Sequence, residues 1–475
     1  MPDRVVIIGG GLSGLAAARR VAERAAGKVE MVVLEARDRV GGAIWTERRD
    51  GFTIEGGADS FITNKPHGVD LCRALGLGDQ LIGTDPQHRR SFIVRDGRLY
   101  PVPEGLVLMA PSRIGPLLTT PILSWRGKLR MLMDLVLPRR DDDDDESLAS
   151  FARRRFGREA FERLVQPLVA GIYTADPAEL SLKATLPQFP ALEREHRSLI
   201  RGARRRARDA DRDASGARYG LFVSLADGMD TLPRALAASL PAGALRLKAA
   251  ARRISRPEPN GPWRVELLDG PSIDAEAVLL ATEAHASARL LDVHDPDLAQ
   301  RLRSIPYASS VIVGAAYRRD QVAHPLDGFG AVVPAIEGKS LLAVSFLSVK
   351  FPARAPSGTV LLRCFLGGAT RPDLFDLDDA SLDALARREL ADLLRVQGDP
   401  LFTTISRHAR AMPQYTLGHL DRVAEVRRLA ARHPRLALAG NAFDGVGIPD
   451  CIRSGHDAAD ALLSSLANPA ARGAA

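Results

Sequence analysis

Three glycines near the N-terminus follow a pattern that suits the binding of a phosphate group. Gly9, Gly11 and Gly14 stand at the end of a predicted strand over residues 4–9, and an alanine-rich segment typical of a helix continues to about residue 26. Glycines at this spacing allow a tight turn and a close approach of a pyrophosphate to the N-terminus of the helix. The alternative is a glycine turn in an ordinary strand–helix–strand unit.

An acidic residue stands where the sugar of an adenine nucleotide needs one. Glu35 lies near the end of a second predicted strand, residues 29–36, and comes 21 residues after Gly14. A carboxylate there accepts hydrogen bonds from the ribose hydroxyls. Gly41 and Gly42 follow, and such a pair lets the backbone pass against a second part of a cofactor; a hairpin turn is the alternative. The order of these features predicts a dinucleotide-binding unit.

The rest of the chain must supply the elements that hold this unit in place. Predicted strands cover residues 245–255, 263–269, 275–282, several runs between 307 and 366, and 436–439. Predicted helices cover residues 379–397 and about 448–466. The acidic run 141–146 is predicted to be a solvated loop before a helix, and the Arg- and Asp-rich segment 194–213 an exposed helix or loop. The tail after Asn468 is expected to fray.

Composition narrows the class of protein. The chain has 475 residues, of which 45% are hydrophobic and 26% charged, which favours two or three folded domains and excludes a mainly disordered or fibrous chain. A net charge of +7 does not indicate a nucleic-acid partner. Cys72, Cys364 and Cys451 show no CxxC spacing, so we expect neither a disulfide framework nor a cysteine zinc site, and a reducing cytosolic location. No apolar run is long enough to predict a membrane-spanning helix.

Further segments resemble one enzyme family. They include GGADSFIT at 57–64, AGIYTADP at 170–177, GFGAVVP at 328–334 and GVGIPDCI at 445–452. Together with residues 5–46 they resemble the oxygen-dependent, FAD-containing porphyrinogen oxidases, a branch of the flavin amine oxidase superfamily that includes coproporphyrinogen III oxidase and protoporphyrinogen oxidase. The segments follow the family order across nearly the whole chain.

The resemblance implies an α/β fold with three parts. These are an FAD-binding Rossmann-like domain of the glutathione-reductase type, a substrate domain built on a mixed sheet, and a helical subdomain. The implied division is 1–86, 215–292 and 430–475 for the FAD-binding domain, 87–103 and 293–429 for the substrate domain, and 104–214 for the helical, membrane-associating subdomain.

The resemblance also implies which residues bind FAD. Those expected along the cofactor are Gly9, Gly10, Gly11, Ser13, Gly14, Glu35, Ala36, Arg39, Gly41, Gly42, Gly57, Ala58, Asp59, Ser60 and Ala251. Those expected to frame the flavin ring are Gly440, Asn441, Val446, Gly447 and Ile448. In such folds the second helix start points at the flavin, and its dipole stabilises the negative charge of the reduced ring. Arg39 as a surface ion-pair partner is the alternative.

For a tetrapyrrole substrate the resemblance implies five candidate contact residues. The Gly171 carbonyl is expected to face the pyrrole N–H groups, Arg89 or Arg90 a propionate, and Phe365 and Val332 a pyrrole ring and the pocket wall. For Phe365 and Val332, ordinary sheet core is an equal alternative. No dedicated catalytic residue and no metal is expected, because the substrate gains aromatic stabilisation and the flavin accepts the hydride.

The implied reaction removes six electrons in three flavin cycles, each ended by molecular oxygen with release of hydrogen peroxide. Coproporphyrinogen III is favoured and protoporphyrinogen IX is the alternative. Residues 105–138 mix apolar and basic side chains, which favours either a peripheral contact with the inner membrane face, docking of a downstream haem-pathway enzyme, or an internally packed helix pair. Other classes left open are a flavin amine oxidase and a non-catalytic escort protein on the same scaffold.

Two positions depart from the family pattern. Glu283 stands where the family usually has Pro, and His408 stands where a Trp is common. A catalytic base is one interpretation of His408, and a structural histidine near a strand end is the other.

Overall fold

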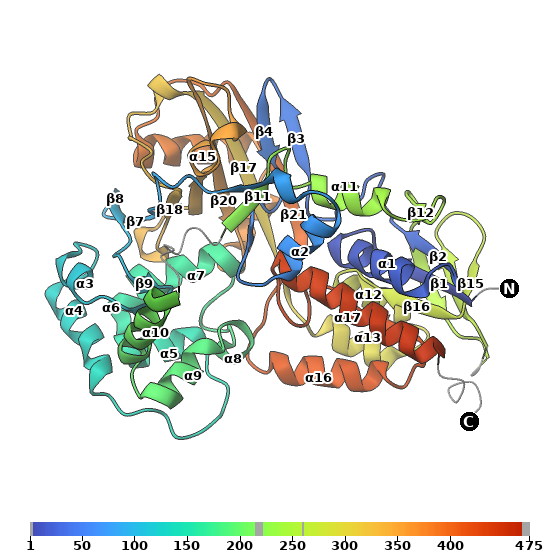
Figure 1. Cartoon of the computed structure of the whole chain (residues 1–475). Coiled ribbons are helices and arrows are strands. Elements are labelled where there is room, and N and C mark those ends of the chain that lie inside the picture. Colours follow the sequence, from blue (N-terminus) through green and yellow to red (C-terminus); the bar gives the residue numbers. More distant parts are fainter. Residues whose placement is uncertain (1–2, 214–221, 259–260, 468–475) are drawn as a thin grey trace.

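The structure is a computed structural model that describes residues 3–213, 222–258 and 261–467 (Figure 1). It contains a five-stranded sheet, a seven-stranded sheet and four smaller sheets. Helices α3 to α10 gather in a separate part, seen at the lower left of Figure 1. The predicted α/β class with two main sheets and a helical part is confirmed; the residue limits of the three domains stay a proposal.

The five-stranded sheet carries the dinucleotide-binding unit. Its order is β12-β2-β1-β16-β22 and all its pairings are parallel. The strands are β1 (Asp3–Ile8), β2 (Val29–Leu34), β12 (Leu245–Arg246), β16 (Ala277–Leu280) and β22 (Leu436–Leu438). Both faces of a parallel sheet are covered, which explains why its central strands β1 and β16 are apolar and fully buried at 5–7 and 277–280.

Two helices from opposite ends of the chain lie side by side on this sheet (Figure 1). They are α1 (Leu12–Ala25) and α17 (Ile448–Ala467). Gly455 permits the close approach, because a Cβ there would lie 2.2 Å from the carbonyl oxygen of Ser13. Packing α17 on α1 therefore brings the second helix start next to the first glycine turn.

In the seven-stranded sheet, side chains alternate between a face that packs in a core and a face that lines a cavity. Its order is β21-β17-β20-β19-β18-β7-β8, with β7 (Phe92–Arg95), β8 (Arg98–Pro101), β17 (Tyr307–Arg318), β18 (Gly330–Val332), β19 (Leu341–Phe346), β20 (Thr359–Gly367) and β21 (Phe402–Pro413). On β20, Leu362, Cys364 and Leu366 pack in one core with α15 (Asp379–Leu394). Because side chains alternate along a strand, Arg363 and Phe365 point to the opposite face.

The helical part has a core of its own, made of residues between 93 and 203 together with Tyr415. It contains α3 (Gly115–Thr119), α4 (Trp125–Leu132), α5 (Leu148–Phe156), α6 (Arg158–Ala160), α7 (Gln166–Tyr173), α8 (Leu182–Thr185), α9 (Gln188–His196) and α10 (Leu199–Asp213). A π-helical turn at Phe161–Val165 joins α6 to α7. The run 141–146 precedes α5 without helix or strand, as predicted.

Smaller elements connect these parts. Strands β3 (Thr46–Arg49) and β4 (Phe52–Glu55) form a hairpin, and β11 (Phe222–Leu225) pairs with β5 (Phe61–Ile62) and β6 (Leu81–Gly83). The remaining strands are β9 (Leu106–Val107), β10 (Ala110–Pro111), β13 (Ala251–Ser255), β14 (Trp263–Leu267) and β15 (Ile273–Ala275). The remaining helices are α2 (His67–Ala74), α11 (Thr231–Ala238), α12 (Ala284–Leu291), α13 (Pro296–Arg303), α14 (Leu347–Lys350) and α16 (His419–Ala430).

Three predicted elements differ from the structure. The strand predicted over 245–255 is two strands in different sheets, because the backbone turns at Lys248, which has a φ of +53°. The strand predicted over 275–282 is divided between β15 and β16, which also belong to different sheets. The helix predicted over 379–397 ends at Leu394, because Arg395 adopts a φ of +53° and closes it.

Two other expectations have simpler outcomes. Segment 194–213 is the end of α9 followed by α10, so of the two alternatives the helix is correct. The tail after Asn468 lies outside the described residues. Among the described helices, none combines the length and apolarity that crossing a bilayer requires.

Candidate active site

The glycine turn after β1 is closed by hydrogen bonds on all sides. Gly9 donates its N–H to the Leu34 carbonyl across 2.8 Å, and Gly41 donates to the Gly10 carbonyl across 2.9 Å. Gly9 has a φ of +115°, which favours glycine, and a Cβ at Gly14 would lie 1.9 Å from the Gly9 oxygen. A Cβ at Gly11, in contrast, would meet nothing within 4 Å, which leaves open space beside the start of α1.

The Glu35 carboxylate is held at the edge of this open space. Its Oε2 accepts the N–H of Gly10 at 2.8 Å and its Oε1 accepts the N–H of Arg37 at 2.9 Å. Each carboxylate oxygen keeps a further lone pair for a hydroxyl donor. The residue is 8% exposed, so the carboxylate is fixed in position before any ligand arrives.

A single cavity of about 750 Å³ joins this turn to the C-terminal helix start and to the seven-stranded sheet. Eighteen of the residues expected to contact cofactor or substrate line it: Gly9, Gly11, Ser13, Glu35, Ala36, Gly41, Gly42, Gly57, Ala58, Asp59, Ser60, Gly171, Ala251, Phe365, Gly440, Asn441, Val446 and Ile448. They come from sequence positions 9 to 448, so the fold brings both glycine-bearing helix starts to one space.

Seven of the expected contacts lie outside the cavity wall. Gly10, Gly14 and Gly447 shape the two turns behind it, and the Arg39 guanidinium donates to the Gly42 carbonyl at 3.0 Å, which supports the turn from the rear. Val332 is 3.5 Å from the position a Cβ at Gly171 would take, one layer behind the wall. Neither Arg89 nor Arg90 lines the cavity. Arg90 forms an exposed ion pair with Asp327 at 3.3 Å.

Sequence reasoning missed several wall residues. Among them are Arg37, Thr282, Ser310, Ile312, Arg363 and Met412. The signal for Arg363 was available, because it precedes Phe365 by two positions on one strand and must share its face. Ser310 and Ile312 alternate in the same way on β17, the strand that pairs with β20.

The C-terminal turn before α17 is held by one buried tyrosine. The Tyr415 hydroxyl donates to the Asn441 carbonyl at 2.6 Å and accepts the N–H of Gly445 at 2.8 Å. The His419 ring stacks on Tyr415 with centroids 3.9 Å apart, and its Nε2 donates to the Phe443 carbonyl at 3.3 Å. Burial lowers the pKa of His419 to about 4, so the ring is neutral near pH 7. The pair fixes residues 441–445 relative to the cavity.

The wall formed by residues 57–60 carries a buried carboxylate between two cations. Asp59 Oδ1 accepts from Lys350 Nζ at 2.9 Å, and Oδ2 accepts from Arg363 Nη1 at 2.9 Å. Burial by itself would raise the pKa of the Asp59 carboxyl, but Lys350 and Arg363 outweigh it and hold the pKa well below its usual range. Asp59 is therefore ionised near pH 7.

His408 lies on the same wall, on β21. Its Nε2 donates to the Gly56 carbonyl at 2.7 Å, which leaves Nδ1 as the unprotonated nitrogen. Burial lowers the pKa of the ring, the hydrogen bond to Gly56 opposes this, and the nearby Arg363 charge lowers it further. The His408 ring is thus neutral, lines the cavity and supports the backbone at Gly56. Glu283, the other departure from the family pattern, lines the same cavity next to Thr282.

The residues present fit a dinucleotide with a planar ring. A helix start with open space at Gly11 suits the pyrophosphate, Glu35 suits the ribose, and a second helix start faces the far end of the cavity. In the described ranges, no group of three or more His, Cys, Asp or Glu side chains is placed to hold a metal ion.

A family model described as flavin containing amine oxidoreductase matches residues 12–463. The chain belongs to this family. It is an FAD-dependent oxidoreductase. The expected membership, enzyme class and cofactor are thereby confirmed, and the escort protein without redox chemistry is not supported.

Full-length relatives come from two enzyme types. The chain is 37% identical to a coproporphyrinogen III oxidase of Propionibacterium freudenreichii subsp. freudenreichii, covering 97% of this chain and 91% of the relative. It is 33% identical to that of Bacillus subtilis (strain 168), covering 97% and 98%, and 32% identical to the protoporphyrinogen oxidase of Bos taurus, covering 98% and 100%.

Solved structures agree on the architecture. A crystal structure named for a protoporphyrinogen oxidase of Exiguobacterium sp. 255-15 superposes with a TM-score of 0.87 at 32% identity, covering 98% of this chain and all of that one. A putrescine oxidase variant superposes with a TM-score of 0.71 at 18% identity, covering 98% and 99%, and shares the fold alone.

Proposed function

We propose that this chain oxidises a porphyrinogen to the porphyrin with FAD as the hydride acceptor and molecular oxygen as the terminal oxidant. The observation that carries the proposal is the one cavity that runs from Glu35 to Phe365 and Gly171. It would supply a dinucleotide site and, beside it, further space lined by Gly171, Ile172, Ile312, Phe365 and Met412. Coproporphyrinogen and protoporphyrinogen oxidases among the full-length relatives support the same substrate class.

The proposed reaction requires the protein mainly to position the substrate and to exclude water. When bound, FAD would supply the acceptor for the hydride lost from a bridging carbon of the substrate, while a pyrrole N–H of the substrate would release a proton. The Gly171 carbonyl, on α7, would accept a pyrrole N–H, and Phe365 would lie against a pyrrole face. The six hydrogen atoms removed leave as three molecules of hydrogen peroxide, formed from three of oxygen. Ile172, Ile312 and Met412 on the wall exclude water.

Coproporphyrinogen III is the proposed substrate, with protoporphyrinogen IX as the alternative. Three relatives named as coproporphyrinogen III oxidases are 30%, 33% and 37% identical to this chain, and the bovine protoporphyrinogen oxidase is 32% identical, so the highest of these identities favours coproporphyrinogen III. The purified protein with FAD should be offered both porphyrinogens in parallel and followed by porphyrin fluorescence. A higher kcat/KM for coproporphyrinogen III supports the proposal, whereas an equal or reversed preference overturns it.

We further propose that the helical part touches an anionic membrane surface. Trp125, Leu129 and Val136 are 67%, 63% and 66% exposed on α4 and the turn after it. Helix α10 packs beside this turn and presents the exposed residues Arg204, Arg205 and Arg206. Apolar side chains flanked by arginines suit the interface of an anionic bilayer.

Vesicle flotation tests this contact. Wild-type protein should float with vesicles that contain phosphatidylglycerol and stay behind with pure phosphatidylcholine. The pair Trp125→Ser and Leu129→Ser should lose flotation. The control Leu268→Ser changes an exposed leucine directly after β14, outside the helical part, and should keep flotation. No flotation with either vesicle type overturns the membrane contact.

A further inference from the structure

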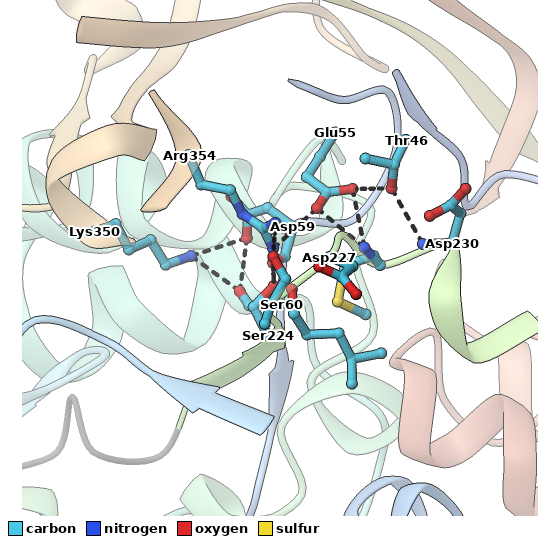
Figure 2. A network of polar contacts seen from close by, with 12 residues as sticks. Thr46, Glu55, Asp59, Ser60, Ser224, Asp227, Asp230, Lys350 and Arg354 are labelled. Atoms are coloured by element: carbon cyan, nitrogen blue, oxygen red, sulfur yellow. Dashed lines mark hydrogen bonds and ion pairs between the residues drawn. The ribbon is translucent and has the colours of Figure 1, made fainter. Parts of the chain in front are cut away.

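Two buried groups of ion-paired side chains lie next to each other between residues 55–59 and residues 350–363 (Figure 2). One joins Asp59 to Lys350 and Arg363. The other joins Glu55 to Arg354, at 3.1 Å with both side chains fully buried. Ser224 links them, since its hydroxyl accepts from Arg354 Nη2 at 2.6 Å and donates to the Asp59 carbonyl at 2.7 Å.

The two groups differ in net charge. Glu55 is balanced by Arg354 and is further held by the Thr46 hydroxyl at 2.7 Å and the Met229 N–H at 3.0 Å. Asp59 faces two cations, Lys350 and Arg363, so this group of three residues carries one net positive charge. No second carboxylate within the described residues pairs with Lys350 or Arg363.

This positive charge is poorly solvated. The side chains of Arg363, Asp59 and Lys350 are 1%, 12% and 14% exposed. The Arg363 Nε is buried and has no hydrogen-bond partner among the described residues, so this guanidinium is not fully satisfied by the protein. In such surroundings a charge is weakly screened and acts on groups several ångströms away.

Two members of this group lie in the wall of the cavity, and Lys350 contacts Asp59 from outside that wall. Asp59 and Arg363 line the cavity together with Phe365 and His408. Arg363 also stacks on the Phe365 ring, with its guanidinium carbon 5.2 Å from the ring centroid.

We propose that Lys350, Asp59 and Arg363 act as a charge-tuning group, whose one net positive charge stabilises the reduced, anionic flavin ring. Reduction by two electrons and one proton leaves that ring with one negative charge. A fixed cation nearby favours it over the neutral oxidised ring and raises the midpoint potential. Asp59 is a positioning residue here, because it holds both cations to the wall. The inference rests on the proposed oxidase function only in supposing that the flavin is reduced at this site.

Three variants distinguish an electrostatic role of this group from a merely structural one. Lys350→Met and Arg363→Met each remove one positive charge and should lower the ratio of reduced to oxidised flavin, in equilibrium with a reference dye, by at least tenfold, which is about 30 mV for a two-electron couple. Asp59→Asn removes the negative charge and should raise it. If all three substitutions shift the equilibrium in the same direction, or none shifts it, the proposal is wrong.

Two further variants keep the test decisive. Lys350→Arg retains the charge and should restore the wild-type equilibrium, which a merely structural role of the lysine shape would not predict. Lys339→Met removes a lysine that pairs with the exposed Asp392 at 3.2 Å away from the cavity wall, and should leave the equilibrium unchanged. If Asp59→Asn or Arg363→Met loses FAD, the Lys350→Met and Lys350→Arg pair decides alone.

The experiment needs FAD but no porphyrinogen. If the proposed substrate is wrong, porphyrin fluorescence will not appear, while the shifts in dye equilibrium will remain. If the charge-tuning group is wrong, fluorescence will appear and the shifts will not. The two proposals therefore fail in distinguishable ways.

Discussion

Gly10 donates its backbone N–H to Glu35 Oε2 across 2.8 Å, which ties the glycine turn after β1 to the end of β2. The bond crosses 25 positions of sequence and fixes the carboxylate before any ribose binds. The dinucleotide site is thus preorganised by backbone groups, and the cofactor need not order it.

Replacing Glu35 should weaken FAD binding without unfolding the chain. Glu35→Ala removes the acceptor proposed for the ribose hydroxyls, and hydrogen bonds to a charged group contribute about 1.5–3 kcal/mol, so the dissociation constant should rise at least tenfold. Titration of apoprotein with FAD measures it. Glu30→Ala, on the same strand but exposed and paired with Arg4, is the matched control. An unchanged dissociation constant for Glu35→Ala would contradict this role.

Two neighbouring glycines should respond differently to alanine. Gly14→Ala places a Cβ 1.9 Å from the Gly9 oxygen and should destabilise the fold by several kcal/mol or prevent folding. Gly11→Ala meets no protein atom within 4 Å, so the apoprotein should keep its melting temperature while losing FAD affinity, since the methyl group occupies the open space. Thermal melting with and without FAD separates the effects. Equal loss of apoprotein stability in both would contradict the assignment.

The buried His419 should make stability depend on pH. Its pKa is lowered from 6.5 to about 4, mainly by burial, so the unfolded chain binds a proton at a higher pH than the folded chain. The free energy of unfolding should therefore fall as pH drops from about 6.5 to about 4, by up to about 3 kcal/mol, and be unaffected by this group above pH 7. Urea unfolding at several pH values measures the slope.

His419→Gln should make that slope shallower by close to one proton. Tyr415→Phe, which removes both bonds to residues 441–445, should weaken FAD binding without changing the slope. An identical slope in wild type and His419→Gln would show that other groups cause the acid sensitivity.

Phe365 should matter for the substrate more than for the cofactor. Phe365→Leu keeps apolar volume but removes the aromatic face, and aromatic contacts contribute about 0.5–1.5 kcal/mol, so KM for the porphyrinogen should rise up to about tenfold. The FAD content and kcat should change little. A fall in kcat with KM unchanged would contradict a role in holding the substrate.

The dinucleotide site was predictable because its parts are local. Gly9, Gly14 and Glu35 fall within one strand–helix–strand unit, so spacing alone places them together. The family resemblance extended this to Gly171 on α7 and to Gly440, whose approach to the first turn depends on α17 packing on α1. The separation of β12 from β13 was missed, because nothing in the sequence marks the turn at Lys248.

Contacts between distant side chains were beyond sequence reasoning. Lys350 reaches Asp59 across 291 positions, and no periodicity predicts that pairing. Arg89 and Arg90 were assigned to a propionate by alignment near a loop, and the structure places neither in the cavity wall. Arg363 carried a usable signal, because its alternation with Phe365 places both side chains on one face of β20. A charged residue in a buried strand needs a partner, however, and the sequence does not show that this partner is Asp59.

The central claim is that one cavity holds FAD and a porphyrinogen together. The most direct measurement follows porphyrin fluorescence and hydrogen peroxide when coproporphyrinogen III is mixed with the FAD-loaded protein in air. We predict porphyrin formation with three molecules of peroxide for each porphyrin, and loss of both signals with the wild-type apoprotein. A yellow, FAD-loaded protein that leaves both coproporphyrinogen III and protoporphyrinogen IX at their spontaneous rates of oxidation would contradict the account.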